Sequence, residues 1–266
     1  LSAVIGQPVV IDNVAGAGGA MGIRKLLGMK PDGHALVLGG ISETVLVPLN
    51  HPGSGYKPQD LQAVSIIGST PLVMVKRKQF PAAHLNDMVK LASSSPMKYT
   101  FGSSGTGSYG HLMFEKLAQV HGVQLLHVPY KGAGQMMSDL ASGQIDLALT
   151  SLPSALPYAN SGFVDLLGVS TPQRLSGWPQ LPTFSESDFG QEPVSLWGGV
   201  FSPRGLKADV TLQISAAIDK SLKDKSLRKK LTQLGILLEK NRSPSESQSF
   251  YEEQIRQYQS GIPPNQ

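Results

Sequence analysis

The chain of 266 residues contains no cysteine, which excludes disulfide bonds, thiolate catalysis and cysteine-ligated metal centres. Charged residues make up 16% of it, against roughly 25% in average globular proteins, which excludes a coiled coil and a highly charged disordered tail. No apolar run approaches the ~20 residues that cross a bilayer. What the chain has in excess is glycine (29 residues) and proline (19), and these favour a globular fold rich in turns.

The net charge is small and positive, at +4. Dense basic runs occur at residues 76–78 and 228–230, and the second run is predicted to lie on the solvated face of a helix whose apolar face is Leu227, Leu231 and Leu234. Because the other basic residues are scattered rather than arranged in a stripe, we expect no nucleic-acid partner.

Short apolar runs separated by turns rich in Gly, Pro and Ser predict alternating strands and helices. Strands are expected at residues 9–11, 35–38, 64–67, 72–75, 99–101, 125–128, 145–149 and 164–169. Continuous apolar runs are typical of strands buried on both faces of a parallel sheet, and repeated strand–helix units indicate an α/β architecture. After residues 197–201 the chain is predicted to be helical, with a capping box at Ser243, Pro244 and Glu246 starting the last helix and Tyr251 and Ile255 on its buried face.

The glycine-rich loop at residues 16–22 follows a predicted strand and precedes a predicted helix, which is the context of a dinucleotide-binding site. The spacing argues against that function, because Met21 stands where the third glycine of the fingerprint belongs. A tight turn that needs small residues for close packing is the favoured interpretation.

The loop at residues 103–108 has the composition of an anion-binding turn. Three serines, a threonine and two glycines separate a predicted strand from a predicted helix, whose free amides carry the positive end of the helix dipole. A Walker loop is excluded because no Lys follows the last Gly, and a nucleophile elbow because position 106 is not Gly. The loop therefore favours a carboxylate or another small anion, with an ordinary helix cap as the alternative.

The six histidines are not at metal-ligand spacing, so no metal is expected. His111 follows the 103–108 loop, one helical turn before Glu115, and a capping or packing role is favoured for it over ligand contact. Asp139 and Asp146 fall on different predicted elements, and no nucleophile–base pair is evident. The missing pair argues against an enzyme, and no cofactor is expected.

A series of motifs in a fixed order resembles the Bug family, the substrate-binding proteins of tripartite tricarboxylate transporters. The motifs lie at residues 9–13, 16–19, 31–33, 99–108, 111–112, 128–132, 143–149, 152–157 and 197–203. Each motif is weak alone, but their ordered combination is specific and spans nearly the whole chain.

The resemblance implies a two-lobed periplasmic binding protein of the second structural type, an α/β fold with mostly parallel sheets, flanking helices and a central ligand cleft. Residues 1–81 and 196–266 would form one lobe and residues 82–195 the other. A monomer in the periplasm would capture a small mono- or dicarboxylate between the lobes and deliver it to integral membrane transporter subunits. The resemblance implies ligand contacts from Gly40, Ser42, Thr70, Ser103, Ser104, Thr106, Gly107, Ser108, Thr150 and Ser151.

Two departures from the family pattern bear on the ligand. Family members begin with a further strand and a Pro-Gly-Gly loop that this sequence does not contain. The resemblance therefore implies either that part of the site lies upstream of Leu1 or that the chain has half a site; the sequence also contains no signal peptide. Thr150 and Ser151 stand where relatives often carry an acidic or amide pair, so we expect a plain carboxylate rather than an amino acid. Two other functions stay open at this point: an enzyme on the same fold using Lys131, His111 or Asp146, and a ligand-sensing module for a membrane kinase.

Overall fold

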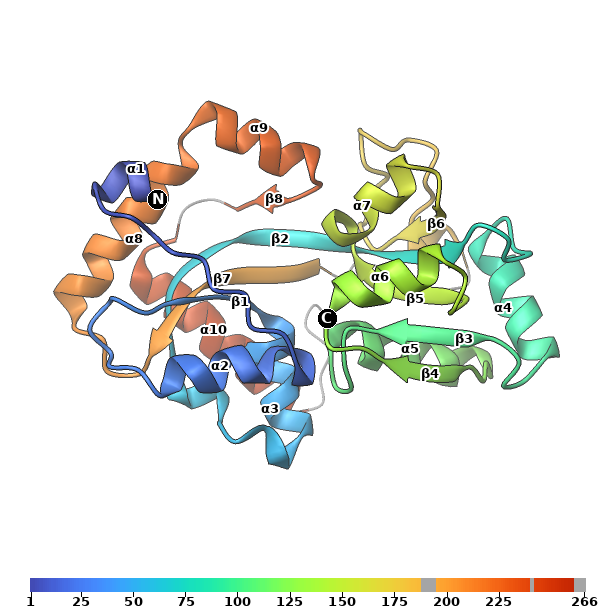
Figure 1. The fold of residues 1–266 in the computed structure, drawn as a ribbon, viewed down its shortest axis with the longest axis horizontal. Helices are drawn as coiled ribbons and strands as arrows, with labels where there is room; N and C mark the ends of the chain where they lie inside the picture. The colour runs from blue at the N-terminus through green and yellow to red at the C-terminus, as the bar shows by residue number, and fades with distance from the viewer. Residues whose placement is uncertain (188–194, 240–241, 261–266) are drawn as a thin grey trace. The chain divides into compact units, whose positions relative to one another are not determined.

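The computed structural model describes residues 1–187, 195–239 and 242–260 (Figure 1). The chain forms two compact units, one made of Leu1–Ser69 and Trp197–Gln266 and the other of Thr70–Leu196. The unit boundary lies inside strand β2 (Leu61–Arg77), drawn in cyan in Figure 1. The division into ligand-binding lobes at residues 81/82 and 195/196 stays a prediction.

The first unit combines a small sheet with helices from both ends of the chain. Its helices are α1 (Ser2–Ile5), α2 (Ala20–Leu27), α3 (Val47–Asn50), α8 (Ala208–Leu222), α9 (Lys225–Gln233) and α10 (Pro244–Gln259). A π-helical turn spans Ser42–Leu46, and 3-10 turns span Ala17–Gly19, Pro52–Ser54 and Pro58–Asp60. Its strands are β1 (Val37–Gly40), the first part of β2, most of β7 (Ser195–Pro203) and β8 (Leu237–Leu238). β1 pairs antiparallel with β7, β7 lies beside β2, and β8 pairs antiparallel with the Gly68 end of β2.

The C-terminal helices complete the core of the first unit. Ile218 of α8 packs against Val64 of β2, and Tyr251 of α10 is fully buried, with its hydroxyl 2.8 Å from the carbonyl oxygen of Thr44. The predicted capping box is confirmed: Ser243 precedes α10, its Oγ accepts the Glu246 N–H, and the Glu246 carboxylate accepts the Ser243 N–H at 2.7 Å. None of the residues of α9 is buried, which confirms that its basic run is a solvated face.

The second unit is a sheet whose strands alternate with helices. Its elements are the last part of β2, α4 (Leu85–Ser94), β3 (Thr100–Ser103), α5 (Tyr109–His121), β4 (Leu126–Pro129), α6 (Ala133–Ala141), β5 (Leu147–Ser151), α7 (Leu152–Asn160), β6 (Val164–Val169) and a 3-10 turn at Phe184–Glu186. The strand order is β6, β2, β5, β3, β4. The core lies between the sheet and α6 and α7, around Val73, Leu140 and Leu152.

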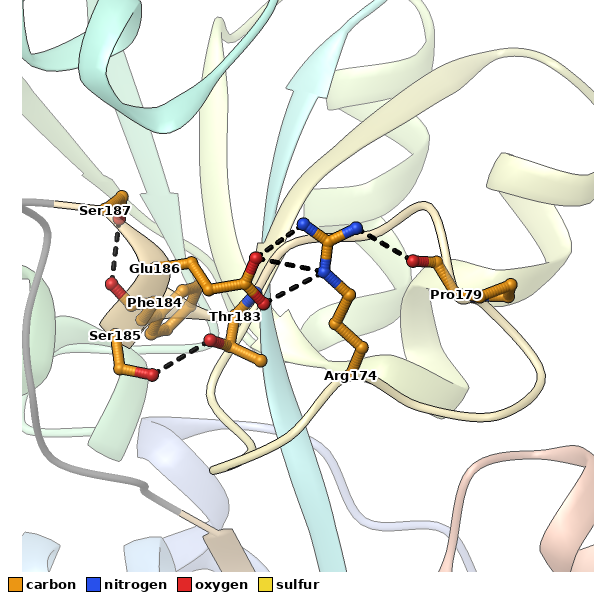
Figure 2. A network of polar contacts seen from close by, with 7 residues as sticks. All are labelled: Arg174, Pro179, Thr183, Phe184, Ser185, Glu186 and Ser187. Atoms are coloured by element: carbon orange, nitrogen blue, oxygen red, sulfur yellow. Dashed lines mark hydrogen bonds and ion pairs between the residues drawn. The ribbon is translucent and has the colours of Figure 1, made fainter.

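The segment after β6 is fixed by one arginine, shown in Figure 2. The Arg174 guanidinium donates to both carboxylate oxygens of Glu186, at 2.9 Å, 3.0 Å and 2.5 Å, and to the carbonyl oxygen of Pro179 at 2.9 Å. The Glu186 carboxylate also accepts the N–H of Thr183 and so caps the 3-10 turn. One bidentate ion pair therefore ties together a stretch with little regular secondary structure of its own.

The structure confirms a mixed α/β fold with flanking helices but corrects three expectations from the sequence. Residues 9–11 are not a strand; Val10 and Ile11 are 87% and 74% exposed. The strands expected at 64–67 and 72–75 are one continuous strand, β2. The sheets are mixed rather than mostly parallel, because β3 pairs parallel with β4 and β5 whereas β2 pairs antiparallel with β5, β6 and β8.

The break predicted inside β2 rested on residues 68–71, and the first of them, Gly68, has a different role in the structure. A Cβ at this position would lie 2.4 Å from the carbonyl oxygen of Leu237. The glycine is therefore required for the close approach of β8 rather than for a turn.

Candidate functional site

Two helix N-termini lie at one edge of the sheet in the second unit. β3 and β5 are parallel neighbours, with Gly102 opposite Ala148, so their carboxyl ends share an edge. α5 follows β3 and α7 follows β5, and the residue before each helix is a serine, Ser108 and Ser151. Free backbone amides at helix N-termini favour anions, so this edge is the candidate functional site.

The loop at residues 103–108, here called the anion loop, is shaped by its glycines. Gly105 and Gly107 have φ angles of 139° and 76°, which side chains with a Cβ disfavour. Ser103 is fully buried, and its Oγ lies 3.1 Å from the carbonyl oxygen of Gly105. The Ser108 N–H donates to the same oxygen at 3.1 Å. The loop is therefore closed by its own hydrogen bonds.

Ser108 is the one serine of the anion loop whose hydroxyl is buried and unpaired. The residue is 1% exposed, and its Oγ has no hydrogen-bond partner among the described residues. It does not accept the helix amides that an N-cap serine usually accepts. A buried hydroxyl without a partner costs roughly 1–3 kcal/mol. This unpaired hydroxyl marks the start of α5 as the candidate position for a ligand.

Two histidines lie directly behind the anion loop. His111 on α5 accepts the Gly107 N–H through Nδ1 at 3.2 Å, and its ring centroid lies 4.1 Å from that of His127 on β4. His127 Nε2 lies 2.7 Å from Ser103 Oγ. Burial and the neighbouring His111 lower the pKa of His127 to about 4. The packing role predicted for His111 is confirmed, since it is 8% exposed and bonded to the loop backbone.

Ser103 and His127 form a serine–histidine contact that the sequence did not reveal. The contact arises because Phe101 and His127 are register partners on β3 and β4. It is not a catalytic arrangement. Ser103 is 0% exposed and already bonded to Gly105, and a histidine with a pKa near 4 is a weak base. The pair holds the loop in place.

The remaining predicted residues of the second unit gather near the same edge. Thr150 and Ser151 are register partners of Val73 and Leu72, and Thr70 lies two residues before Leu72 on β2. Thr150 is buried, and Ser151 Oγ lies 2.8 Å from Ser154 Oγ. In the anion loop, Ser104 is half-buried, Thr106 is exposed and Gly107 is buried. The structure thus brings eight of the ten predicted residues into one unit: Thr70, Ser103, Ser104, Thr106, Gly107, Ser108, Thr150 and Ser151.

Gly40 and Ser42 belong to the first unit, where sequence reasoning missed Glu43 as the partner of the Gly40 amide. Glu43 accepts the Gly40 N–H at 2.7 Å, so that amide is already bonded. Burial raises the pKa of Glu43, and its hydrogen bonds to backbone amides oppose the rise. A Cβ at Gly19 would lie 2.6 Å from the Cβ of Glu43, which confirms that the glycine-rich loop is needed for close packing.

Metal and membrane features are not found in the part of the chain that the structure describes. Within it, no three His, Asp or Glu side chains come together in a way that would hold a metal ion. The helices described there include none with the length and apolar character that a membrane span requires.

The fold and the anion loop define the class: a solute-binding protein of mixed α/β architecture. The model of the tripartite tricarboxylate transporter family receptor matches residues 1–262, and the chain belongs to this family. Its members are periplasmic binding proteins associated with transport rather than enzymes, so the resemblance stated above and the expectation of a binding protein are confirmed.

Relatives of known sequence and structure agree with this assignment. The protein of the TAR-I ttuE-ttuC' intergenic region of Agrobacterium vitis is 30% identical, over 88% of this chain and 68% of that protein. BugT of Bordetella pertussis is 29% identical, over 84% of this chain and 69% of its own length. Among solved structures, a periplasmic transporter matches with a TM-score of 0.92 and 32% identity, covering 98% of this chain and 87% of that one. MatC from Rhodopseudomonas palustris with bound malate matches with a TM-score of 0.91 and 26% identity, over 97% of this chain and 89% of that chain.

Proposed function

We propose that this protein binds a small mono- or dicarboxylate at the anion loop and delivers it, as a monomer in the periplasm, to the membrane subunits of a tripartite transporter. The observation that carries the proposal is the buried, unpaired hydroxyl of Ser108 at the N-terminus of α5. Family membership supports the transport role. Two relatives support the ligand class: MatC with malate, and Rpa4515 of R. palustris with adipate, which is 28% identical with a TM-score of 0.91.

The chemistry of binding follows from the groups at the edge of the sheet. A carboxylate oxygen accepts a hydrogen bond from Ser108 Oγ and from amides at the start of α5, where the helix dipole favours negative charge. The half-buried Ser104 and exposed Thr106 add hydroxyl donors. Residues 103–108 and 150–154 contain no Lys or Arg, so recognition rests on dipoles rather than on a guanidinium.

The same residues favour a plain carboxylate over an amino acid. Residues 103–108 and 150–151 contain no Asp or Glu that would accept an ammonium group. A charged hydrogen bond of this kind contributes roughly 1.5–3 kcal/mol, so its absence weakens amino-acid binding by about tenfold or more.

Calorimetric titration of the full chain with malate and with adipate tests the proposal. Ser108→Ala is expected to weaken binding at least about tenfold, corresponding to one hydrogen bond of about 1.4 kcal/mol. Ser161→Ala is the matched control, because this serine lies beyond the C-terminal end of α7, where its Oγ donates to the Pro157 carbonyl oxygen. The control is expected to bind like the wild type.

The unliganded stability of the same variant separates a ligand-binding role from a structural one. Ser108→Ala removes an unpaired buried hydroxyl, so the free energy of unfolding without ligand is expected to stay the same or to rise. A variant that lost stability but kept its affinity would show that the hydroxyl is structural. A thermal-shift panel in which only amino acids stabilised the wild type would overturn the preference for plain carboxylates.

A further inference from the structure

The amide of Gly107 in the anion loop is hydrogen-bonded to a side chain of α5, the helix that follows the loop. Gly107 is buried, and its N–H donates to His111 Nδ1 at 3.2 Å. Its φ of 76° lies in the left-handed region that favours glycine, and the next residue is Ser108. The orientation of Ser108 therefore depends on the bond between Gly107 and His111.

This bond fixes the protonation state of His111. Because Nδ1 accepts the Gly107 N–H, it carries no proton, and the ring proton lies on Nε2. Nε2 lies 3.3 Å from Glu115 Oε1, one helical turn further along α5. The anion loop thus has its described shape only with the uncharged imidazole in the Nε2–H form.

A second proton on the His111 ring would have to sit on Nδ1, the nitrogen that accepts the Gly107 N–H. Glu115 of α5 itself faces the other nitrogen, and β4 contributes His127, whose ring centroid lies 4.1 Å away with the two rings tilted by 31°. β3 contributes Ser103 and Phe101, whose contacts with His127 are uncharged, and β5 lies against α5 through the backbone of Leu149. A proton on Nδ1 would point at the Gly107 N–H, so that two donors would face each other and the bond would break.

We propose that His111 is a positioning residue for the anion loop, and that carboxylate binding is lost when its Nδ1 takes up a proton. The inference rests on the proposed function, because the loop it positions is the proposed ligand site. His111 does not touch the ligand. The bond from Gly107 to His111 holds the loop so that Ser108 Oγ has no protein partner and can bond the ligand. Because protonation of Nδ1 breaks this bond, ligand affinity falls as the pH is lowered.

Two amide substitutions at His111 distinguish the roles of its two ring nitrogens. In His111→Asn the side-chain oxygen can take the place of Nδ1 and accept the Gly107 N–H, whereas in His111→Gln the oxygen reaches the place of Nε2. With malate as the probe at about pH 7.5, His111→Gln is expected to lose affinity about tenfold or more, and His111→Asn to recover most of it. A residue that only filled space would not distinguish the two amides in this way.

The pH profile provides the second readout. Wild-type affinity for malate is expected to fall at least about tenfold between roughly pH 7.5 and 5, and that of His111→Asn to fall less, because an amide does not titrate in this range. Protonation of malate itself affects both proteins equally and cancels in the comparison. His84→Asn is the control: His84 is exposed, lies before α4 and is expected to keep the wild-type profile.

Identical pH profiles for the wild type and His111→Asn would overturn the positioning role while leaving the proposed function intact. Full affinity of His111→Gln at about pH 7.5 would do the same. Failure of the wild type to bind malate or adipate at any pH would instead overturn the proposed function, so the two failures are distinct.

Discussion

Gly110 of α5 lies so close to Leu149 of β5 that a Cβ at position 110 would come within 2.4 Å of the Leu149 carbonyl oxygen. The approach seats the first turn of α5 directly on the sheet, beside the edge where β3 and β5 end. A backbone oxygen has no rotamer with which to move aside, so the helix itself would have to shift. The position of the anion loop therefore depends on the absence of a side chain at residue 110.

Gly110→Ala is expected to lower the free energy of unfolding by about 1–3 kcal/mol and to weaken carboxylate binding, because α5 must move from the sheet. The matched control is Gly134→Ala in α6, where a Cβ meets nothing within 4 Å. There the substitution is expected to stabilise the protein by about 0.5–1 kcal/mol, since alanine is the better helix former. Urea unfolding measures the free energy of unfolding of both variants. Equal effects at the two positions would contradict the close approach.

Asp165→Asn is expected to destabilise the second unit, because Asp165 is the partner of a buried lysine. Lys76 is 7% exposed, and its Nζ lies 2.9 Å from Asp165 Oδ2. Burial opposes ionisation of Asp165, but hydrogen bonds from Lys76 and Lys78 hold the pKa of its carboxyl below the usual value. Removing the charge leaves the Lys76 ammonium without its carboxylate, at a cost of about 2–3 kcal/mol for this partly exposed pair.

Lys78→Gln is the control for this substitution. Its side chain is 54% exposed and pairs with the other oxygen of Asp165 at 2.7 Å. An exposed ion pair contributes about 0–1 kcal/mol. Chemical denaturation should therefore rank Asp165→Asn well below Lys78→Gln in stability, and the reverse order would show that Lys76 is not effectively buried.

The ion pair in Figure 2 predicts a stability change at acidic pH. Hydrogen bonds from Arg174 lower the pKa of Glu186 from 4.5 to about 2. A depressed carboxyl pKa stabilises the folded state above the unfolded-state value, and this stabilisation is lost as the pH falls from about 4.5 to 2. The difference in Tm between wild type and Glu186→Gln is therefore expected to be largest above about pH 5 and to shrink toward pH 2. A Tm difference that stayed constant between about pH 5 and 2 would contradict the lowered pKa of Glu186.

Tyr251→Phe is expected to lower the free energy of unfolding by about 1–3 kcal/mol. The Tyr251 hydroxyl is buried between the carbonyl oxygens of Thr44 and Pro58, at 2.8 Å and 2.9 Å, and without it neither oxygen keeps this donor. Tyr158→Phe in α7 is the control, because the Tyr158 hydroxyl makes no hydrogen bond to the residues described. Thermal unfolding is expected to separate the two variants; similar losses would show that the lost hydroxyl bonds do not explain the effect.

Much of the fold could be predicted because its strands are short apolar runs with turns at both ends. The strand predicted at residues 164–169 has those bounds as β6, and the runs predicted near β1, β3, β4 and β5 are strands within a few residues. The prediction of a break in β2 was wrong, because the residue type at the predicted break is explained by a contact with a residue far away in the sequence. Gly68 indicates a turn by its type, yet the structure uses it to admit the Leu237 backbone.

The candidate site could be predicted only in its local part. The composition of residues 103–108 indicated an anion loop before a helix, and the structure places that loop at the N-terminus of α5. The contact of Ser103 with His127 depends on the register of β3 and β4, and no local pattern encodes register across a crossover helix. The bond from Gly40 to Glu43 spans three residues but depends on a π-helical turn, a rare conformation without a distinctive sequence signal.

The path of the chain through the two units sets an order for folding. The second unit is one uninterrupted segment, Thr70–Leu196, whereas the first needs both Leu1–Ser69 and Trp197–Gln266. β1 cannot pair until β7 has been synthesised, and the carbonyl oxygens of Thr44 and Pro58 cannot accept their hydrogen bonds until Tyr251 has been synthesised. During synthesis the later segment can therefore collapse first, while the earlier one leaves the ribosome long before its partners and remains exposed to chaperones and to aggregation.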